Sequence, residues 1–151
     1  AHHCLAIPAD DPIRSSCWTR RAPYLHGDEQ QQLLPKKIEA VAGQRVVAVS
    51  AGGGHSIALT ADGAVWSWGD GGRGMLGHGD EQLQLLPKKV EAFARQRVAA
   101  VLAGEDHSLA ITADGAVFTW GKGEDGFLRH GADLPNQLPP KKIEARNASA
   151  E

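Results

Sequence analysis

The sequence contains few of the residues on which several classes of protein depend. Its 151 residues include only two cysteines, one methionine and 5% aromatic residues, and the formal net charge is −2. Two cysteines are too few for a disulfide framework, which indicates a reducing compartment. The small net charge argues against nucleic-acid binding, and the lack of a long apolar run or a secretory leader argues against a membrane protein. We therefore expect a cytoplasmic or nuclear protein with neither a membrane nor a nucleic acid as its partner.

Glycine, in contrast, is abundant, with 18 residues, and much of it lies in a segment that occurs twice. Residues 51–79 are AGGGHSIALTADGAVWSWGDGGRGMLGHG, and residues 103–131 are AGEDHSLAITADGAVFTWGKGEDGFLRHG. His55 and His107, for example, are 52 positions apart. Repetition at a fixed period of this size indicates supersecondary units that stack on one another.

The period divides the chain into segments. Residues 1–22 show no relation to the repeat, and we expect an irregular lead-in there. A weak match near Trp18, however, indicates the degenerate end of an earlier unit. Because the last copy stops early and the chain begins with Ala1, a fragment of a larger protein is expected. The repeat region is expected at residues 23–146, and a short tail at residues 147–151. Within the repeat region, two full units are expected at about 28–79 and 80–131, and a partial third unit at 132–146.

Each unit is predicted to contain four short strands and no crossover helix. In the first unit the predicted strands are 36–40, 45–50, 56–60 and 64–68. Along the third of these, Ile57 and Leu59 share one face, as expected for alternation in a strand. The connections are too short for crossover helices, so an antiparallel unit is predicted.

Two Asp-Gly pairs are predicted to close tight hairpins within these units. They are Asp62-Gly63 and Asp114-Gly115, and both residue types tolerate the positive φ of a type I′ turn. A β-branched residue resists positive φ, so Gly63→Val is expected to destabilise the fold. The same change at Gly43, in a looser connection, is expected to matter less.

The motifs resemble the repeats of the regulator of chromosome condensation family. The resemblance is carried by VSAGGGHSIALTADG from Val49, by WSWG from Trp66 and by GMLGHG from Gly74, and it covers roughly residues 25–145. It implies an all-β fold: a partial β-propeller with two full four-stranded antiparallel blades and incomplete flanking blades. Closed propellers have about four to eight blades, so this chain is not expected to close a ring alone.

The histidines of the repeat are interpreted as structural. His55 and His107 each precede a serine, and neither has the acid, base or nucleophile that catalysis would require. A neutral imidazole can both donate and accept a hydrogen bond, which suits a once-per-blade structural role. We predict no catalytic, cofactor-binding or metal-binding residue, and the structural repeat positions are Gly52, His55, Asp62, Gly63, Trp68, Gly69, Gly74, His78, Gly104, His107, Asp114, Gly115, Trp120, Gly121, Gly126 and His130.

Three other patterns invite functional interpretations. The segments 69–74 and 121–126 match G-x-G-x-x-G, but no helical pattern follows them, so turns are predicted instead of a nucleotide site. The tripeptide at 2–4, His-His-Cys, lacks the second ligand pair of a zinc site. The lysine pairs that recur at 36–37, 88–89 and 141–142 would form a basic row in stacked blades, or would protect edge strands from pairing.

These observations favour a protein–protein interaction module. The resemblance to the family leaves two alternatives open: a guanine-nucleotide exchange factor for a small GTPase, and a substrate-recruiting piece of a HECT-type ubiquitin ligase. No exchange loop can be matched, and no catalytic ligase domain is present in these residues. Photoreceptor members of the family carry tryptophan in the loop before the repeat histidine. The corresponding loops here, residues 52–54 and 104–106, contain no tryptophan. Trp66, Trp68 and Trp120 are therefore interpreted as packing anchors.

Overall fold

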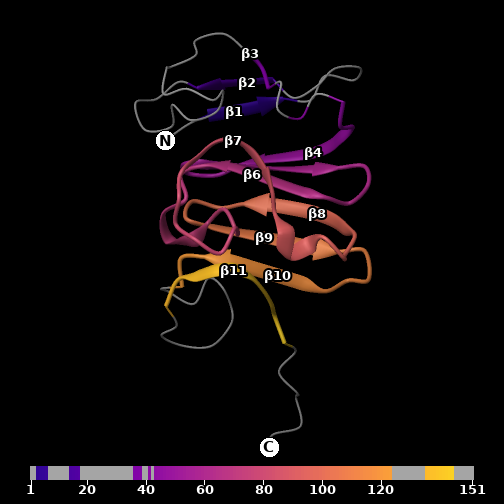
Figure 1. Cartoon of the computed structure of the whole chain (residues 1–151), viewed down its shortest axis with the longest axis vertical. Coiled ribbons are helices and arrows are strands. Elements are labelled where there is room, and N and C mark those ends of the chain that lie inside the picture. Colours follow the sequence, from indigo (N-terminus) through magenta and orange to yellow (C-terminus); the bar gives the residue numbers. More distant parts are fainter. Residues whose placement is uncertain are drawn as a thin grey trace, which may run out of the picture.

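Three antiparallel β-sheets are stacked face to face along the long axis of the molecule (Figure 1). The structure is a computed structural model, and it describes residues 3–6, 14–17, 36–38, 41, 43–123 and 135–144. Among these residues, no helix has the length and apolar character needed to cross a membrane. The all-β architecture predicted from the sequence is confirmed.

The two full sheets have the same strand order. Sheet B consists of β4 (Val46–Ala51), β5 (His55–Thr60), β6 (Val65–Gly69) and β7 (Gln84–Lys89). Sheet C consists of β8 (Val98–Ala103), β9 (His107–Thr112), β10 (Val117–Gly121) and β11 (Gln137–Lys142). Sheet A has three strands, β1 (His3–Ala6), β2 (Arg14–Cys17) and β3 (Lys36–Lys37), and two short 3₁₀ helices, η2 (Gly72–Gly74) and η3 (Glu91–Phe93), lie in the connections.

The sheets are out of phase with the sequence repeat by one strand. The predicted first strand of the first unit contributes β3, which pairs with β2 of sheet A instead of β4. In the same way β7 completes sheet B by pairing with β6, and residues 137–142 complete sheet C instead of starting a separate incomplete blade. The prediction that the four strands of one sequence unit form one blade was therefore wrong. The long β6–β7 connection lets the chain return antiparallel beside β6, and sequence periodicity does not reveal this pairing.

Sheet A corrects the expectation of an irregular lead-in at residues 1–22. Its first two strands pair His3 with Cys17 and Ala6 with Arg14. Sheet B pairs His55 with Gly69 in the same register, 52 positions later. The sequence signal was weak because few residues in this stretch are identical to those of the later copies.

The Asp-Gly hairpins are present, but their turn type differs from the prediction. The backbone N–H of Thr60 donates to Ala64 O at 3.0 Å, which leaves a three-residue loop, and Gly63 N donates to Thr60 O at 2.9 Å. Gly63 has φ of 83°, whereas Asp62 does not have a positive φ. This is the turn in which a single left-handed glycine follows a type I bend, and not a two-residue type I′ turn. Asp62 instead supports the loop by accepting hydrogen bonds from the Thr60 hydroxyl and from Ala64 N.

The main hydrophobic core lies between sheets B and C. Leu59 and Val65 of sheet B are buried in one cluster with Trp120 of sheet C. Phe93 from η3 joins them and meets Phe118 edge to face, with ring centroids 5.3 Å apart. On the other side of sheet B, a second cluster is formed by Ile38, Val41, Ala58 and Trp68. Because β5 is covered on both sides, all six of its residues are buried.

Candidate functional site

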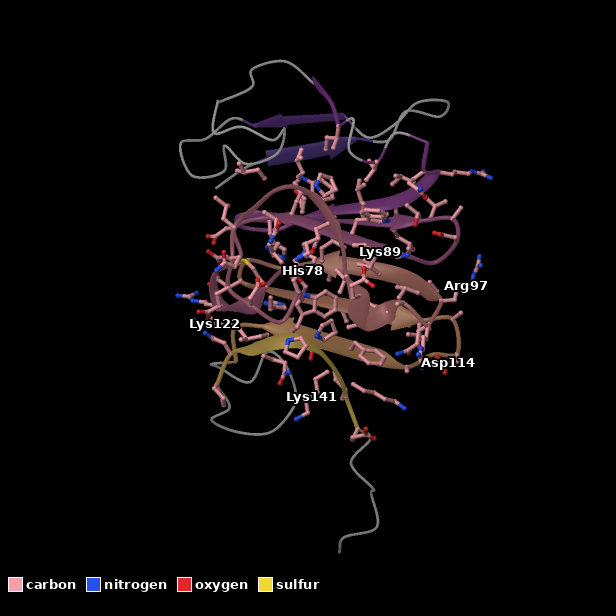
Figure 2. All side chains as sticks on the ribbon, viewed as in Figure 1. His78, Lys89, Arg97, Asp114, Lys122 and Lys141 are labelled. Carbon is pink, nitrogen blue, oxygen red and sulfur yellow. The ribbon has the colours of Figure 1, made fainter. Side chains whose placement is uncertain are left out.

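A groove opens where loops of sheets B and C meet at one edge of the stack. Its volume is about 410 Å³. The β4–β5, β6–β7 and β8–β9 connections all contribute to it, and its lining residues are Gly53, Gly54, Asp70, Gly72, Arg73, Met75, Glu105 and Asp106. Both turns that carry the Asp-Gly pairs lie at the opposite ends of the strands; Figure 2 shows Lys122 at one edge and Arg97 and Asp114 at the other.

The β6–β7 connection reaches across from sheet B to sheet C. Gly74 and Gly77 have φ of 75° and 79°, which favour glycine. Both also lie against sheet C, because a Cβ on Gly74 would sit 2.6 Å from Leu138 Cδ2, and one on Gly77 would sit 2.8 Å from Trp120 Nε1. The G-x-G-x-x-G match at 69–74 is thus a turn containing η2, as predicted, and it packs on the next sheet.

The carbonyl of Met75 in this connection joins the two sheets. It accepts hydrogen bonds from Trp120 Nε1 at 2.9 Å and from Ser108 Oγ at 2.8 Å. His55 Nε2 lies 2.7 Å from the same serine oxygen. Because the hydroxyl has one proton and donates it to Met75, His55 Nε2 must donate to Ser108. His55 of sheet B therefore bonds to Ser108 of sheet C, and Ser108 bonds to the β6–β7 connection of sheet B. A structural role for His55 requires a hydrogen bond of this kind.

A second histidine–serine–carbonyl arrangement lies within sheet B. Ser67 Oγ donates to Leu76 O at 2.6 Å, and His78 Nε2 lies 3.0 Å from Ser67 Oγ. By the same proton count, His78 donates from Nε2. Burial and the nearby charge of Lys88 hold the pKa of His78 below its usual value. His78 is accordingly neutral near pH 7.

The groove contains more acid than base. Arg73 forms an ion pair with Asp106 across the junction of sheets B and C, and Asp70 and Glu105 are also exposed there. Arg73 has φ of 62° and is the one described non-glycine residue with a positive φ. No group of three or more His, Cys, Asp or Glu in the described part of the chain is arranged to hold a metal ion.

The structure does not gather the predicted repeat positions into one site. Trp68 and Trp120 are fully buried between sheets, and Gly52, Gly69, Gly104 and Gly121 lie where a loop closely approaches a neighbouring backbone or a histidine ring. Hydrogen bonds from the threonines two residues before them lower the pKa values of Asp62 and Asp114, which lie at the turn edge with Gly63 and Gly115. Gly126 and His130 lie outside the described residues.

Sequence reasoning missed the residues that line the groove and the role of Ser108 in linking sheets B and C. Arg73 and Asp106 are far apart in the sequence, and no motif indicates their pairing. A signal did exist for Ser108, because a serine follows the repeat histidine in both copies.

A family model described as the regulator of chromosome condensation (RCC1) repeat matches residues 26–59 and 62–111. A second model with the same description matches residues 46–74 and 98–126. The chain belongs to the RCC1 repeat family. Its stacked sheets are accordingly blades of a partial β-propeller, and the fold implied by the resemblance of the motifs is confirmed.

Relatives and solved structures of this family are similar over most of the chain. The chain is 35% identical to the ultraviolet-B receptor UVR8 of Arabidopsis thaliana over 97% of its own length and 33% of the receptor. It is 44% identical to the human E3 ubiquitin-protein ligase HERC2 over 72% of its length and 2% of the ligase. The crystal structure of Prp20p from Saccharomyces cerevisiae superposes with a TM-score of 0.82 at 23% identity, covering 95% of this chain and 36% of that one. The chain thus spans a third or less of these two curated relatives.

Proposed function

We propose that this RCC1-repeat chain is a protein–protein interaction module and that its contact surface is the groove at the loop edge of sheets B and C. The observation that carries the proposal is the division of the polar side chains. His55, Ser67 and Ser108 are buried in hydrogen bonds within the stack. Four charged side chains of the loops, those of Asp70, Arg73, Glu105 and Asp106, in contrast, border the groove. A cytoplasmic or nuclear location is part of this proposal.

The charges of the groove favour a partner with a basic segment. Three carboxylates, those of Asp70, Glu105 and Asp106, face one guanidinium, that of Arg73. Opposite charges across an interface raise the association rate and select among partners. The two aspartates and the glutamate therefore give the loop edge a preference for basic segments. At the turn edge, in contrast, the exposed Arg95 and Arg97 balance Asp62 and Asp114.

Charge reversal tests this surface. We expect the Asp70→Lys/Glu105→Lys variant to lose the proteins that the unmodified chain captures from a cell extract, as quantified by mass spectrometry. The matched control is Glu91→Lys/Glu144→Lys, which makes the same change in net charge at exposed residues away from the groove. Equal loss of capture by the two variants would place the contact surface elsewhere.

A role as a nucleotide exchange factor is favoured by one structural neighbour. Prp20p is described by its binding properties to Gsp1p and histones. If this chain acts on a small GTPase, adding it will accelerate the release of fluorescent GDP from at least one member of a recombinant GTPase panel. Unchanged release across the panel would leave the interaction module without exchange activity.

A role in substrate recruitment for a ubiquitin ligase is favoured by the sequence relatives, since HERC2 is 44% identical to this chain. The chain matches only 2% of that ligase, so catalytic activity would belong to other residues of a parent protein. Sequencing the transcript on both sides of the region that encodes this chain tests the idea. A HECT-type catalytic domain in the same reading frame would support it, and its lack would remove this alternative.

A further inference from the structure

The three recurring lysine pairs occupy the same position in the three sheets. They lie on β3, β7 and β11, and each of these strands is the last strand at the same edge of its sheet. The first lysine of each pair lies opposite a hydroxyl residue of the neighbouring strand, and these residues are Ser15, Ser67 and Thr119. The pairs are therefore aligned along the stack, as a basic row requires.

The lysine row is defined here by the four members whose side chains the structure describes, Lys88, Lys89, Lys141 and Lys142. Three of them are exposed and Lys89 is half-buried. In Figure 2, Lys89 and Lys141 lie between the loop edge, marked by Lys122, and the turn edge, marked by Arg97. Lys88 is exposed although sheet B has a neighbouring sheet on each side. Access to the row therefore does not depend on where the stack ends.

The charges of the row are not paired within the described part of the chain. None of the four ammonium groups forms an ion pair there, whereas Arg73 pairs with Asp106. One exposed glutamate follows each pair, Glu91 in the first case and Glu144 in the second, so four positive charges stand against two negative ones. Burial and the charge of Lys88 lower the pKa of His78, which shows that this ammonium group acts on its surroundings. The row can therefore attract a negatively charged partner.

Protection of the sheet edges does not require the lysines. Pro87 and Pro140 come directly before the two pairs, and proline has no N–H with which to pair an added strand. Val90 N donates to Val65 O at 2.8 Å, so strand alternation turns the N–H of Lys89 away from the sheet. A strand added at this edge would meet that N–H next to a proline that offers none. The prolines thus already limit edge pairing, and the repeated lysines serve another purpose.

The composition of the row favours carboxylates over phosphates as ligands. The row contains lysine and no arginine, whose planar guanidinium group is the better match for phosphates. Glu91 and Glu144 interrupt the positive charge, and the net charge of −2 opposes a long uniform polyanion or an anionic membrane. An acidic polypeptide, in contrast, can place carboxylates at the lysine pairs and neutral residues between them.

We propose that the lysine row binds an acidic polypeptide segment, which runs in extended conformation along the stack from one outer strand to the next. Packed sheets lie about 10 Å apart, and an extended chain advances about 3.3 Å per residue, so about three residues separate neighbouring lysine pairs. Two acidic residues followed by one neutral residue match this spacing. The proposal goes beyond the interaction module described above, because it concerns the outer strands and a partner of the opposite charge.

A fluorescein-labelled peptide of Glu-Glu-Ser repeats, added to the full chain, tests the proposal. Its fluorescence anisotropy is expected to rise on binding, and its affinity is expected to fall at least fivefold when salt is raised to the physiological level, because salt screens exposed charges. The matched peptide of Gln-Gln-Ser repeats is expected to bind at least tenfold more weakly. Equal binding of the two peptides would overturn the proposal, as would tighter binding of an oligothymidylate or of vesicles that contain phosphatidylserine.

Charge reversal shows whether the peptide uses the row. Lys88→Glu and Lys141→Glu are each expected to weaken binding of the acidic peptide at least fivefold. The matched control is Arg45→Glu, which makes the same change in net charge at an exposed residue directly before β4, at the opposite edge of sheet B. This control is expected to change the affinity less than twofold. Equal effects of the three substitutions would mean that only net charge matters, which would overturn the proposal.

A milder variant keeps the test decisive if a reversed variant does not fold, which circular dichroism checks. Lys88→Gln/Lys141→Gln removes the two charges and keeps most of each side chain. It is expected to weaken binding of the acidic peptide at least threefold. Unchanged binding by this folded variant would overturn the proposal.

Discussion

His55 shows how a buried polar side chain can link two sheets through a hydrogen bond that crosses between them. His55 is fully buried, and the proton count at Ser108 makes it a donor to that serine. The serine in turn anchors the Met75 carbonyl, which also accepts from Trp120. Each group in this series of hydrogen bonds depends on the next, so removing one group leaves a buried polar partner without its hydrogen bond.

We expect His55→Ala to lower the free energy of unfolding by about 1–3 kcal/mol, because it leaves Ser108 Oγ without its donor. Urea unfolding of His55→Ala, Ser108→Ala and the double variant measures the effect. The double variant is expected to lose clearly less than the sum of the single losses. Additive losses, or a His55→Ala variant as stable as the unmodified chain, would contradict the proposed structural role.

His78 predicts a dependence of stability on pH. Its pKa is lowered in the folded state, chiefly by burial, so the unfolded chain binds a proton more readily as pH falls below about 6.5. This contribution to stability is fully present above that pH and is lost on acidification. We expect the urea midpoint to fall between pH 7.5 and 5, and to fall less in His78→Gln. Parallel pH profiles for the two proteins would show that His78 does not titrate in this way.

At the scale of the strand pair, the hairpin loops of sheets B and C are the same turn in two surroundings. Gly63 and Gly115 have φ of 83° and 89°. Only the first lies against the following sheet, through Arg97. Gly43 also has a positive φ, 86°, with nothing near it, so the connection expected to be loose carries the same backbone requirement.

We therefore expect Gly63→Val to destabilise more than either Gly115→Val or Gly43→Val. All three replacements strain a left-handed backbone, but only the first also collides with a neighbouring sheet. Urea unfolding of the three variants, side by side, measures the difference. Equal losses would mean that backbone strain alone decides the cost, and that the contact between Gly63 and Arg97 contributes little.

At the scale of the whole molecule, the exposed apolar end of the stack limits stability. Repeat proteins gain stability from interfaces between neighbouring units, and an end unit with an apolar outer face lacks one. Leu102 and Ile111 are exposed at this end. The described sheets thus share fewer interfaces per blade than a closed propeller would have.

We expect the purified chain to be only marginally stable, with a melting midpoint below about 60 °C, toward the low end for small domains. Calorimetry measures the midpoint, and light scattering shows the size of the species that melts. A monodisperse monomer with a cooperative transition well above that temperature would mean that two full blades build more core than their exposed end suggests.

The sequence alone determined the repeat, the strand-rich fold and the family, because these depend on local patterns. The alternation in β5, the Asp-Gly loops and the paired copies of the histidine motif are all readable within a few residues of one another. The structural interpretation of His55 and the turn at 69–74 followed from the same local evidence. The incorrect prediction of a type I′ turn also came from the local pattern, because Asp-Gly suits both the predicted two-residue loop and the observed three-residue loop.

Only the tertiary structure decided how the strands divide into sheets and which loops form the groove. The pairing of β6 with β7 crosses a long connection, and the pairing of β2 with β3 recruits a strand that sequence periodicity assigned to the next unit. Arg73 meets Asp106, and Met75 meets Trp120, only because adjacent sheets stack in register. Such contacts depend on the relative placement of whole sheets, and burial of apolar faces between the sheets sets that placement.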